Sequence, residues 1–218
     1  MSAFKARLGE EDVAVGNIFC IGRNYAAHAA ELNNPLEDEP LVFLKPTSAL
    51  AGEGVPLRLP NYSSDVHHEC ELVLLIGKGG RDIAESEALD HVAGYGIGLD
   101  MTARDVQSAA KSKGHPWTKA KGFPTAACLS RLTPAAQVAD PQRLSFELRV
   151  NGELRQQGDT GLMLFPVAAI IAYLSRIYGL QAGDLIYTGT PEGVAAVRSG
   201  DKLSLKLDGL ASAEWSVL

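Results

Sequence analysis

The sequence predicts an α+β fold that is mostly β, with a few short helices. Eight short segments carry strand signals, because they are rich in apolar and β-branched residues and are bounded by turn residues. Three segments carry helical signals, and they do not alternate with the strands as a doubly wound sheet would require. Asn151 and Gly152 separate two alternating apolar runs, and they predict a hairpin because both residues tolerate a positive φ.

The three helices are expected near the N-terminus, in the middle and in the C-terminal half of the chain. The first covers Tyr25–Leu32. The second, Thr102–Lys113, is followed directly by a glycine and then by a proline, which end it. The third begins at Pro166, where a missing N–H costs nothing, and stops at Gly179. The strands are expected at Leu41–Leu44, Pro56–Leu59, Glu71–Ile76, Ala93–Leu99, Leu144–Val150, Leu154–Gln157, Leu185–Thr188 and Leu203–Leu207.

Bulk properties limit the function classes. The length of 218 residues predicts a single domain, residues 1–218, in which about the first 40 residues are a candidate cap and lid. A net charge of -6 argues against a nucleic-acid groove. The three cysteines are far apart and odd in number, which indicates a reducing compartment. The most apolar helical run, Val167–Leu174, is too short for a bilayer, so a cytoplasmic protein is expected.

Two glutamates, Glu69 and Glu71, come at the start of an expected apolar strand, directly after His67 and His68. A period of two places both carboxylates on one face of that strand and Cys70 on the other. Two such carboxylates repel each other unless one is protonated or a divalent cation lies between them. A solvated strand edge explains an isolated Glu-x-Glu as simply. The two histidines are neighbours of a metal site or plain surface residues.

A third carboxylate, Asp100, ends a glycine-rich segment before the second expected helix. Three carboxylates, with water and substrate oxygens, suit Mg²⁺ or Mn²⁺, and the lack of paired Cys or His ligands disfavours zinc. In the alternative interpretation, Asp100 complements the helix dipole while Thr102 and Asp105 form a capping box.

Arg104, Gln107 and Lys111 lie three and four residues apart and therefore share one face of that helix. This spacing suits a solvated polar face as well as an anion site. The anion site is favoured because Arg104 and Gln107 start one turn from the proposed metal.

Five segments in chain order resemble those of the fumarylacetoacetate hydrolase family, from about Asn17 to the C-terminus. The most similar branch is that of the short acylpyruvases and oxaloacetate decarboxylases. The segments are Gly22–Glu31 (GRNYAAHAAE), Phe43–Pro46 (FLKP), His68–Leu72 (HECEL), Leu99–Gln107 (LDMTARDVQ) and Thr188–Pro191 (TGTP).

The resemblance implies a fold of rolled and packed mixed β-sheets and a homodimer. It implies Mg²⁺ or Mn²⁺ held by Glu69, Glu71 and Asp100, and a catalytic pair, His28 and Glu31, on a lid helix.

Lys121 matches the family's active-site lysine, and Lys119 is the neighbour with which it could be confused. The substrate-binding residues are expected to be Arg23, Arg104, Gln107 and Thr190.

These residues predict chemistry on small 2-oxo acids. A cation would polarise the 2-oxo group and stabilise an enolate as the neighbouring C–C bond breaks. The pair His28 and Glu31 would activate water against a 3-acylpyruvate such as fumarylpyruvate or acetylpyruvate, giving pyruvate and a carboxylic acid. Lys121 and Arg104 would add positive charge. The same site would serve oxaloacetate decarboxylation, or isomerisation of a 2-oxo acid, as an alternative.

Other classes are less favoured. The sequence has no Gly-x-Ser-x-Gly elbow of a serine hydrolase. The glycines of residues 94–98 have the wrong spacing for a dinucleotide site. A protein that binds Ca²⁺ or Mg²⁺ for stability is the non-enzyme alternative, but it leaves Lys121, His28 and Glu31 without a purpose.

Overall fold

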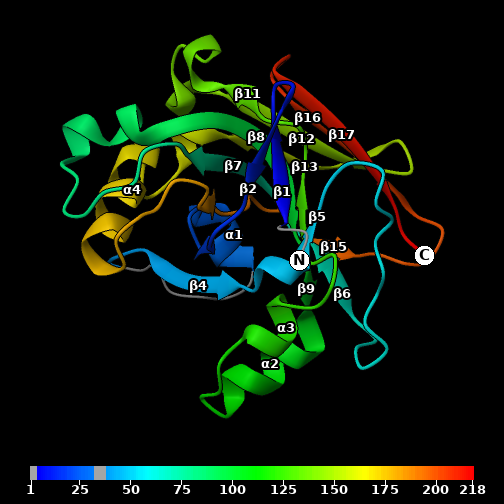
Figure 1. Ribbon diagram of the computed structural model, residues 1–218. Coiled ribbons are helices and arrows are strands. Elements are labelled where there is room, and N and C mark those ends of the chain that lie inside the picture. Colours follow the sequence, from blue (N-terminus) through cyan, green and yellow to red (C-terminus); the bar gives the residue numbers. More distant parts are fainter. Residues whose placement is uncertain (1–3, 32–37) are drawn as a thin grey trace.

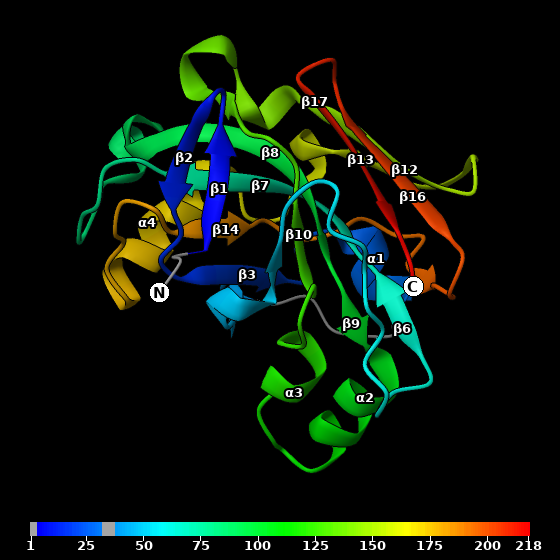
Figure 2. The ribbon, with the colours of Figure 1, turned by 45° about the vertical axis from the view of Figure 1, so that its right-hand side comes forward.

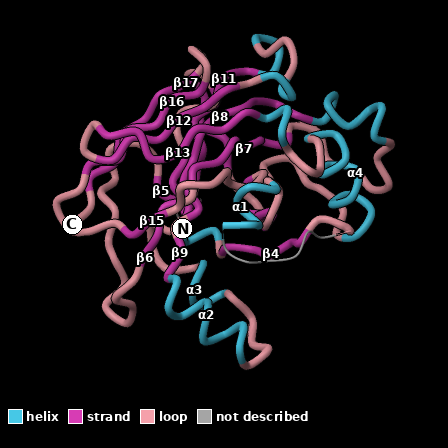
Figure 3. Tube along the Cα trace, turned by 180° about the vertical axis from the view of Figure 1, so that it is seen from behind, coloured by secondary structure: helices cyan, strands magenta, loops and turns pink. Residues whose placement is uncertain are grey.

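The computed structural model describes residues 4–31 and 38–218, and within these residues it has seventeen strands and four α-helices. The strands form curled sheets that occupy most of the molecule, and the helices are short and peripheral (Figure 1 and Figure 3). The predicted α+β, mostly β class is therefore confirmed. Residues 1–3 and 32–37 of the expected cap and lid, with the end of the first expected helix at Leu32, lie outside the described residues.

The largest sheet has eight strands and is mixed, because β14 runs parallel to β3 and β10 runs parallel to β5, whereas the other pairs are antiparallel. Its centre is β7, whose side chains are all buried, as expected for a strand covered on both faces. In spatial order the strands are β4 (Leu41–Lys45), β3 (Ile18–Gly22), β14 (Leu185–Tyr187), β7 (Cys70–Ile76), β8 (Val92–Asp100), β10 (Ala127–Leu129) and β5 (Leu50–Ala51), and β11 (Thr133–Pro134) also pairs with β8.

Three smaller sheets complete the β structure. A four-stranded antiparallel sheet packs across β8 and carries the predicted Asn151-Gly152 hairpin, in which both residues have a positive φ. The strands of these sheets are β13 (Glu153–Asp159), β12 (Ser145–Val150), β16 (Lys202–Leu207) and β17 (Ala211–Ser216); β15 (Ala195–Ala196), β6 (Val66–His68) and β9 (Thr102–Ala103); and β1 (Lys5–Leu8) with β2 (Glu11–Ala14).

The helices lie at the margins of the sheets. α2 (Arg104–Ser112) and α3 (Thr118–Lys121) contact each other and project from one end of the molecule (Figure 1 and Figure 2). α4 (Val167–Ile177) buries a stripe of apolar residues with helical spacing, and α1 (Ala26–Glu31) is a short helix after β3. None of the helices in the described part of the chain has the length and apolar character needed to span a membrane.

Most of the predicted elements are present, with two corrections. The expected strand Pro56–Leu59 is wrong, since only Leu57 makes an isolated bridge, and neither Pro56 nor the following Pro60 can donate to a ladder. The second helix starts two residues later than expected because Thr102 and Ala103 pair with β6 as strand β9. Several short strands, the helix α3 and the strand β17 were not predicted.

The capping box of the alternative interpretation is absent at α2. The N-cap residue is Ala103, which makes no side-chain cap. The carboxylate of Asp105 instead accepts hydrogen bonds from Ser63 Oγ at 2.6 Å and from the N–H of Ser64 at 3.1 Å, and so ties α2 to the preceding loop.

Close packing at Gly98 on β8 positions the site strand. A Cβ at this residue would meet the carbonyl oxygen of Cys128, the ring of Tyr187 at 2.9 Å and the side chain of Val73 at 2.9 Å. Gly98 is also the register partner of Glu71 on β7. A side chain here would therefore push apart the strands that hold the buried glutamate.

We expect Gly98→Ala to lower the free energy of unfolding by about 1–3 kcal/mol, the usual cost of overpacking a core. Chemical denaturation monitored by circular dichroism measures this change. Gly52→Ala is the control, because a Cβ at Gly52 meets nothing within 4 Å. An equal and small effect of both substitutions would show that the strands tolerate the added methyl group.

Candidate metal centre and active site

Three buried carboxylates meet where β7 and β8 run side by side. Glu69 immediately precedes β7, Glu71 lies within it, and Asp100 is the last residue of β8. The N–H of Asp100 donates to the carbonyl of Glu69 at 2.8 Å, so the antiparallel register sets the two residues opposite each other. Ligand atoms of the three side chains lie within 4.8 Å of one another.

Two buried lysines face this cluster. Lys121 Nζ, at the end of α3, donates to Glu69 Oε2 at 2.7 Å and to Asp100 Oδ2 at 2.6 Å. Lys45 Nζ, at the end of β4, forms an ion pair with Asp100 Oδ1 at 2.6 Å and donates to the carbonyls of Met101 at 3.1 Å and Lys121 at 2.5 Å. The two ammonium groups thus connect the carboxylates to α3 and to the edge strand of the large sheet.

The surroundings shift the pKa values of Glu69 and Glu71 in opposite directions. Burial by itself raises the pKa of a carboxyl, but the charges of Lys121 and Arg104 outweigh it and hold the pKa of Glu69 well below its ordinary value. Burial, together with the charges of Asp100 and Glu69, raises the pKa of Glu71 well above its ordinary value. The protein alone therefore favours the neutral form of Glu71, and a bound cation would favour its carboxylate.

The first turn of α2 brings Arg104 and Gln107 to the same pocket. Arg104 donates to Glu69 Oε1 at 2.5 Å and to Gln107 Oε1 at 2.8 Å. Its Nε–H is buried and has no hydrogen-bond partner among the described residues.

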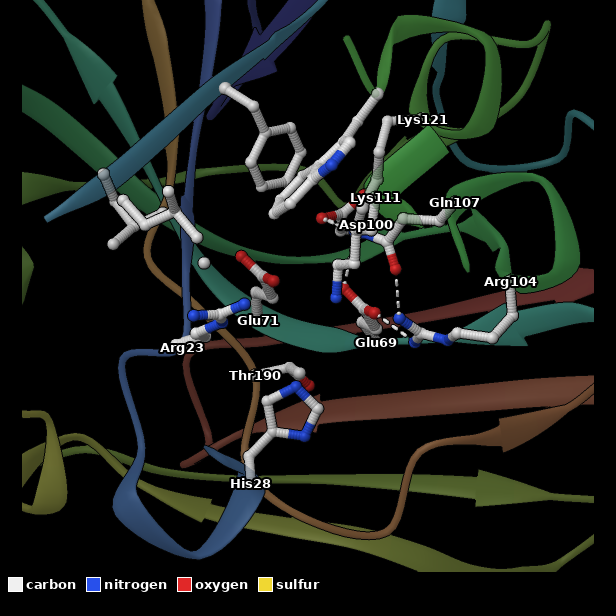
Figure 4. Close-up of a pocket in the computed structure, with 15 residues that line it drawn as sticks. Arg23, His28, Glu69, Glu71, Asp100, Arg104, Gln107, Lys111, Lys121 and Thr190 are labelled. Atoms are coloured by element: carbon white, nitrogen blue, oxygen red, sulfur yellow. Dashed lines mark hydrogen bonds and ion pairs between the residues drawn. The ribbon is translucent and has the colours of Figure 1, made fainter. Parts of the chain in front are cut away.

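The pair expected on the first helix is present. Nδ1 of His28 lies 3.3 Å from Glu31 Oε2, and Glu31 Oε1 accepts the N–H of Gly193 at 3.0 Å. His28 lines the pocket of the carboxylates, and in Figure 4 it lies on the side of Glu69 and Glu71 opposite to Lys121.

The turn after β14 binds the strand of the two glutamates through several hydrogen bonds, which its sequence did not indicate. The N–H of Gly189 donates to Glu71 Oε2 at 2.8 Å. The hydroxyl of Thr190 donates to the carbonyl of Cys70 at 2.8 Å and accepts from Gln156 Nε2 at 2.8 Å. Thr190 lines the pocket, but its hydroxyl is already engaged by the protein.

The remaining expected residues divide between the pocket and the surface. Arg23 has a left-handed backbone with φ of 58° and lines the pocket, as does Lys111, which also lies 5.1 Å from the ring of Trp117. Lys119 lies over the ring of Tyr62 at 5.1 Å and not among the pocket residues. Of the two neighbouring lysines, Lys121 is therefore the one that faces the site.

His68 and His67, for which two interpretations were open, differ in their surroundings. His68 is buried behind the site, where its Nδ1 lies 3.0 Å from Gln156 Oε1, and burial lowers its pKa. His67 is partly exposed and its Nε2 lies 2.8 Å from Asp65 Oδ1.

Sequence reasoning missed Lys45, Phe43, Trp117 and Gln156. The first two lie within the segment that resembles the family, where a lysine at the end of an apolar strand was the available signal. The ring of Phe43 lies 4.8 Å from Lys121 Nζ, and both aromatic residues line the pocket. No local signal marks Gln156, because its partners are far away in the sequence.

The residues fit a hard divalent cation. All three ligand groups are carboxylates, and the oxygen-only set is the one that Mg²⁺ and Mn²⁺ prefer. Each of the three side chains is buried, so a cation bound between them would be largely shielded from water. Burial and the two neighbouring carboxylates raise the pKa of Glu71, and a bound cation would oppose both effects.

A family model described as fumarylacetoacetate (FAA) hydrolase C-terminal matches residues 17–218. The chain belongs to the fumarylacetoacetate hydrolase family. Membership confirms the resemblance seen in the sequence and the expected fold of rolled mixed sheets, and it makes the chain an enzyme of a family of hydrolases and isomerases.

Individual relatives cover nearly the whole chain. Oxaloacetate tautomerase FAHD1, mitochondrial, of Rattus norvegicus is 48% identical over 201 residues, which is 92% of this chain and 91% of the relative. The fumarylpyruvate hydrolase from Pseudomonas aeruginosa, solved in complex with Mn²⁺ and pyruvate, has a TM-score of 0.96 and 40% identity, covering 100% of this chain and 97% of that chain. The 5-carboxymethyl-2-hydroxymuconate delta-isomerase from Mycobacterium smegmatis has a TM-score of 0.85 and 33% identity, covering 99% and 82%.

We expect binding of Mn²⁺ to release a proton, because Glu71 must lose the proton that its raised pKa retains. The affinity should therefore increase as the pH rises towards the pKa of Glu71. Calorimetry in buffers with different ionisation enthalpies counts the proton. In Glu71→Gln the release should disappear and the affinity should fall at least about tenfold. An affinity independent of pH would contradict this assignment.

Proposed function

We propose that the protein is a Mg²⁺- or Mn²⁺-dependent hydrolase that cleaves the C–C bond of 3-acylpyruvates, such as fumarylpyruvate or acetylpyruvate. The observation that carries the proposal is that His28, whose Nδ1 lies 3.3 Å from Glu31, and the three buried carboxylates line one pocket. The relative from Pseudomonas aeruginosa, named a fumarylpyruvate hydrolase, supports the choice of substrate.

Glu69, Glu71 and Asp100 would hold the cation, which supplies Lewis-acid polarisation of the 2-oxo group when bound. The protein side chains supply the remaining chemistry.

His28 and Glu31 on α1 would carry out the proton transfers. With Nδ1–H of His28 donating to Glu31, Nε2 is unprotonated and takes a proton from water. The hydroxide attacks the distal carbonyl carbon, the C–C bond breaks, and its electron pair passes to the pyruvate part as an enolate. The imidazolium returns the proton to that enolate carbon, so that one water is consumed and pyruvate and a carboxylic acid are formed.

Cationic and amide groups would orient the substrate. The ammonium of Lys121 lies between two carboxylates and adds positive charge next to the position where the enolate forms. The unpaired Nε–H of Arg104 is available to a substrate oxygen, and Gln107 holds the guanidinium in place. Arg23 and Thr190 line the same pocket as further substrate contacts.

Oxaloacetate chemistry is the second candidate, favoured by the rat relative that is named an oxaloacetate tautomerase. Tautomerisation needs a base that moves the C3 proton, and His28 is suitably placed for this role as well. Decarboxylation needs the polarised 2-oxo group without activated water.

The proposal includes four features of the whole protein. Residues 1–218 form one catalytic domain in which the N-terminal part around α1 acts as cap and lid while β3 remains in the large sheet, and the active form is a homodimer. The enzyme works in the cytoplasm, although the rat relative is named as mitochondrial. Its acylpyruvate substrates arise in the catabolism of aromatic compounds.

The first experiment compares turnover of acetylpyruvate, fumarylpyruvate and oxaloacetate by the purified protein, with Mg²⁺ or Mn²⁺ and with EDTA. Metal-dependent cleavage of an acylpyruvate is the expected result. Tautomerisation of oxaloacetate or its loss of CO₂, with both acylpyruvates untouched, would replace the hydrolase with the second candidate. A protein that turns over none of the three, yet is stabilised by Mg²⁺, would be the metal-stabilised binding protein.

We expect Glu31→Gln to lower kcat for acylpyruvate hydrolysis by about 10²- to 10⁴-fold, the usual contribution of general base catalysis. Affinity for Mn²⁺ should change less than about threefold, because Glu31 is not one of the clustered carboxylates. Glu11→Gln is the matched control on an exposed strand, and it should leave both quantities unchanged. Full hydrolysis by the Glu31 variant would remove the pair from the mechanism.

A further inference from the structure

A buried amide, Gln156 on β13, joins the two halves of the site. Its Oε1 accepts the N–H of Cys70 at 3.0 Å and lies 3.0 Å from Nδ1 of His68. Because Cys70 N–H can only donate, the amide oxygen must face this strand, which fixes the orientation of the whole side chain. Cys70 lies between Glu69 and Glu71, so this end of the amide holds the strand of the carboxylates.

The other end of the amide holds the loop after β14. Gln156 Nε2 donates to Thr190 Oγ1 at 2.8 Å, to the carbonyl of Pro191 at 3.0 Å and, more weakly, to the carbonyl of Glu192 at 3.4 Å. Gln156 is only 1% exposed, so no water molecule is in place to donate to these acceptors if the amide N–H groups are removed. A buried polar group that loses its partner keeps the full cost of desolvation, so the loop depends on this amide.

The same loop contacts the catalytic pair. The N–H of Gly193 donates to Glu31 Oε1, which leaves Oε2 to face His28. Gly193 has φ of 90°, and a Cβ at this residue would collide with the carbonyl oxygen of Arg155 on β13. The segment 190–193 is therefore held against β13 at both ends, by Gln156 and by the close approach of Gly193.

We propose that Gln156 is a positioning residue for the His28–Glu31 pair and acts through the segment 190–193. The chain of contacts runs from the amide to the loop carbonyls, from the loop to the N–H of Gly193, and from this N–H to Glu31. The inference rests on the proposed function of the pair, and it adds a residue from a different sheet to the apparatus that orients the base.

The substitution Gln156→Glu keeps the function of one end of the side chain and removes that of the other. A carboxyl oxygen can still accept from Cys70, but the group that faced three acceptors no longer carries two N–H donors. Gln157→Glu is the matched control, because it introduces the same group on the exposed face of the same strand.

We expect Gln156→Glu to lower kcat for acylpyruvate hydrolysis by about tenfold to a hundredfold, as for other small misplacements of a catalytic group. KM and Mn²⁺ affinity should change less than about threefold. In a Glu31→Gln background, the added Gln156→Glu substitution should cost less than about twofold, because its effect passes through Glu31. Additive losses in the double variant, or an equal loss of Mn²⁺ affinity, would overturn the inference.

Hydrogen–deuterium exchange separates this inference from the proposed function. Amides of residues 26–31 and of Gly193 should exchange faster in Gln156→Glu than in the wild type or in Gln157→Glu. This result supports the positioning role even if the wild type turns over no acylpyruvate, an outcome that would overturn only the proposed function. Unchanged exchange would overturn the inference. If Gln156→Glu does not fold, Gly193→Ala tests the same link from the loop side, with the same expected loss and faster exchange.

Discussion

The burial of three carboxylates at one point is the constraint on which the rest of the site depends. Two unit charges 4.8 Å apart, the upper limit for the ligand atoms here, repel by about 3 to 4 kcal/mol at an effective dielectric constant of 20. The protein offsets this repulsion with Lys45, Lys121 and Arg104, which come from β4, α3 and α2. The packing of the edge strand β4 and of the helices α2 and α3 therefore brings the compensating positive charges to the site. The pKa of Glu71 stays raised in the presence of these three cations, so its negative charge is not fully compensated by the protein. A bound divalent ion would compensate it.

The segment from Gly189 to Gly193 links this charge cluster to His28 and Glu31, the proposed catalytic pair. Its first N–H binds Glu71 and its last N–H binds Glu31. Between these two contacts, the hydroxyl of Thr190 holds the strand of the carboxylates through the carbonyl of Cys70. One short loop thus contacts both Glu71, a proposed ligand of the cation, and Glu31, which is proposed to orient the base, so a change in the loop would affect both parts of the proposed chemistry.

Prediction from the sequence succeeded where the signal was local. The alternating and apolar runs that became β7, β8, β12 and β16 are long enough to show their period, and the Asn151-Gly152 turn has a specific backbone requirement. The strand β17 was missed because its segment has few β-branched residues and takes its strand form from pairing with β16. The capping box of the alternative interpretation does not form at α2, because Asp105 accepts hydrogen bonds from Ser63 and Ser64 in a separate loop.

The sequence by itself determined the family, the fold class and the set of residues expected in the site, because five short segments in order and a spacing of two between glutamates are visible along the chain. Only the tertiary structure decided which groups compensate which charges. Lys45 and Asp100 are 55 residues apart and Gln156 and Cys70 are 86 residues apart, and no periodicity along the chain records such pairs. Their contacts arise from strand register and from the packing of separate sheets, and the charge state of Glu71 follows from those contacts.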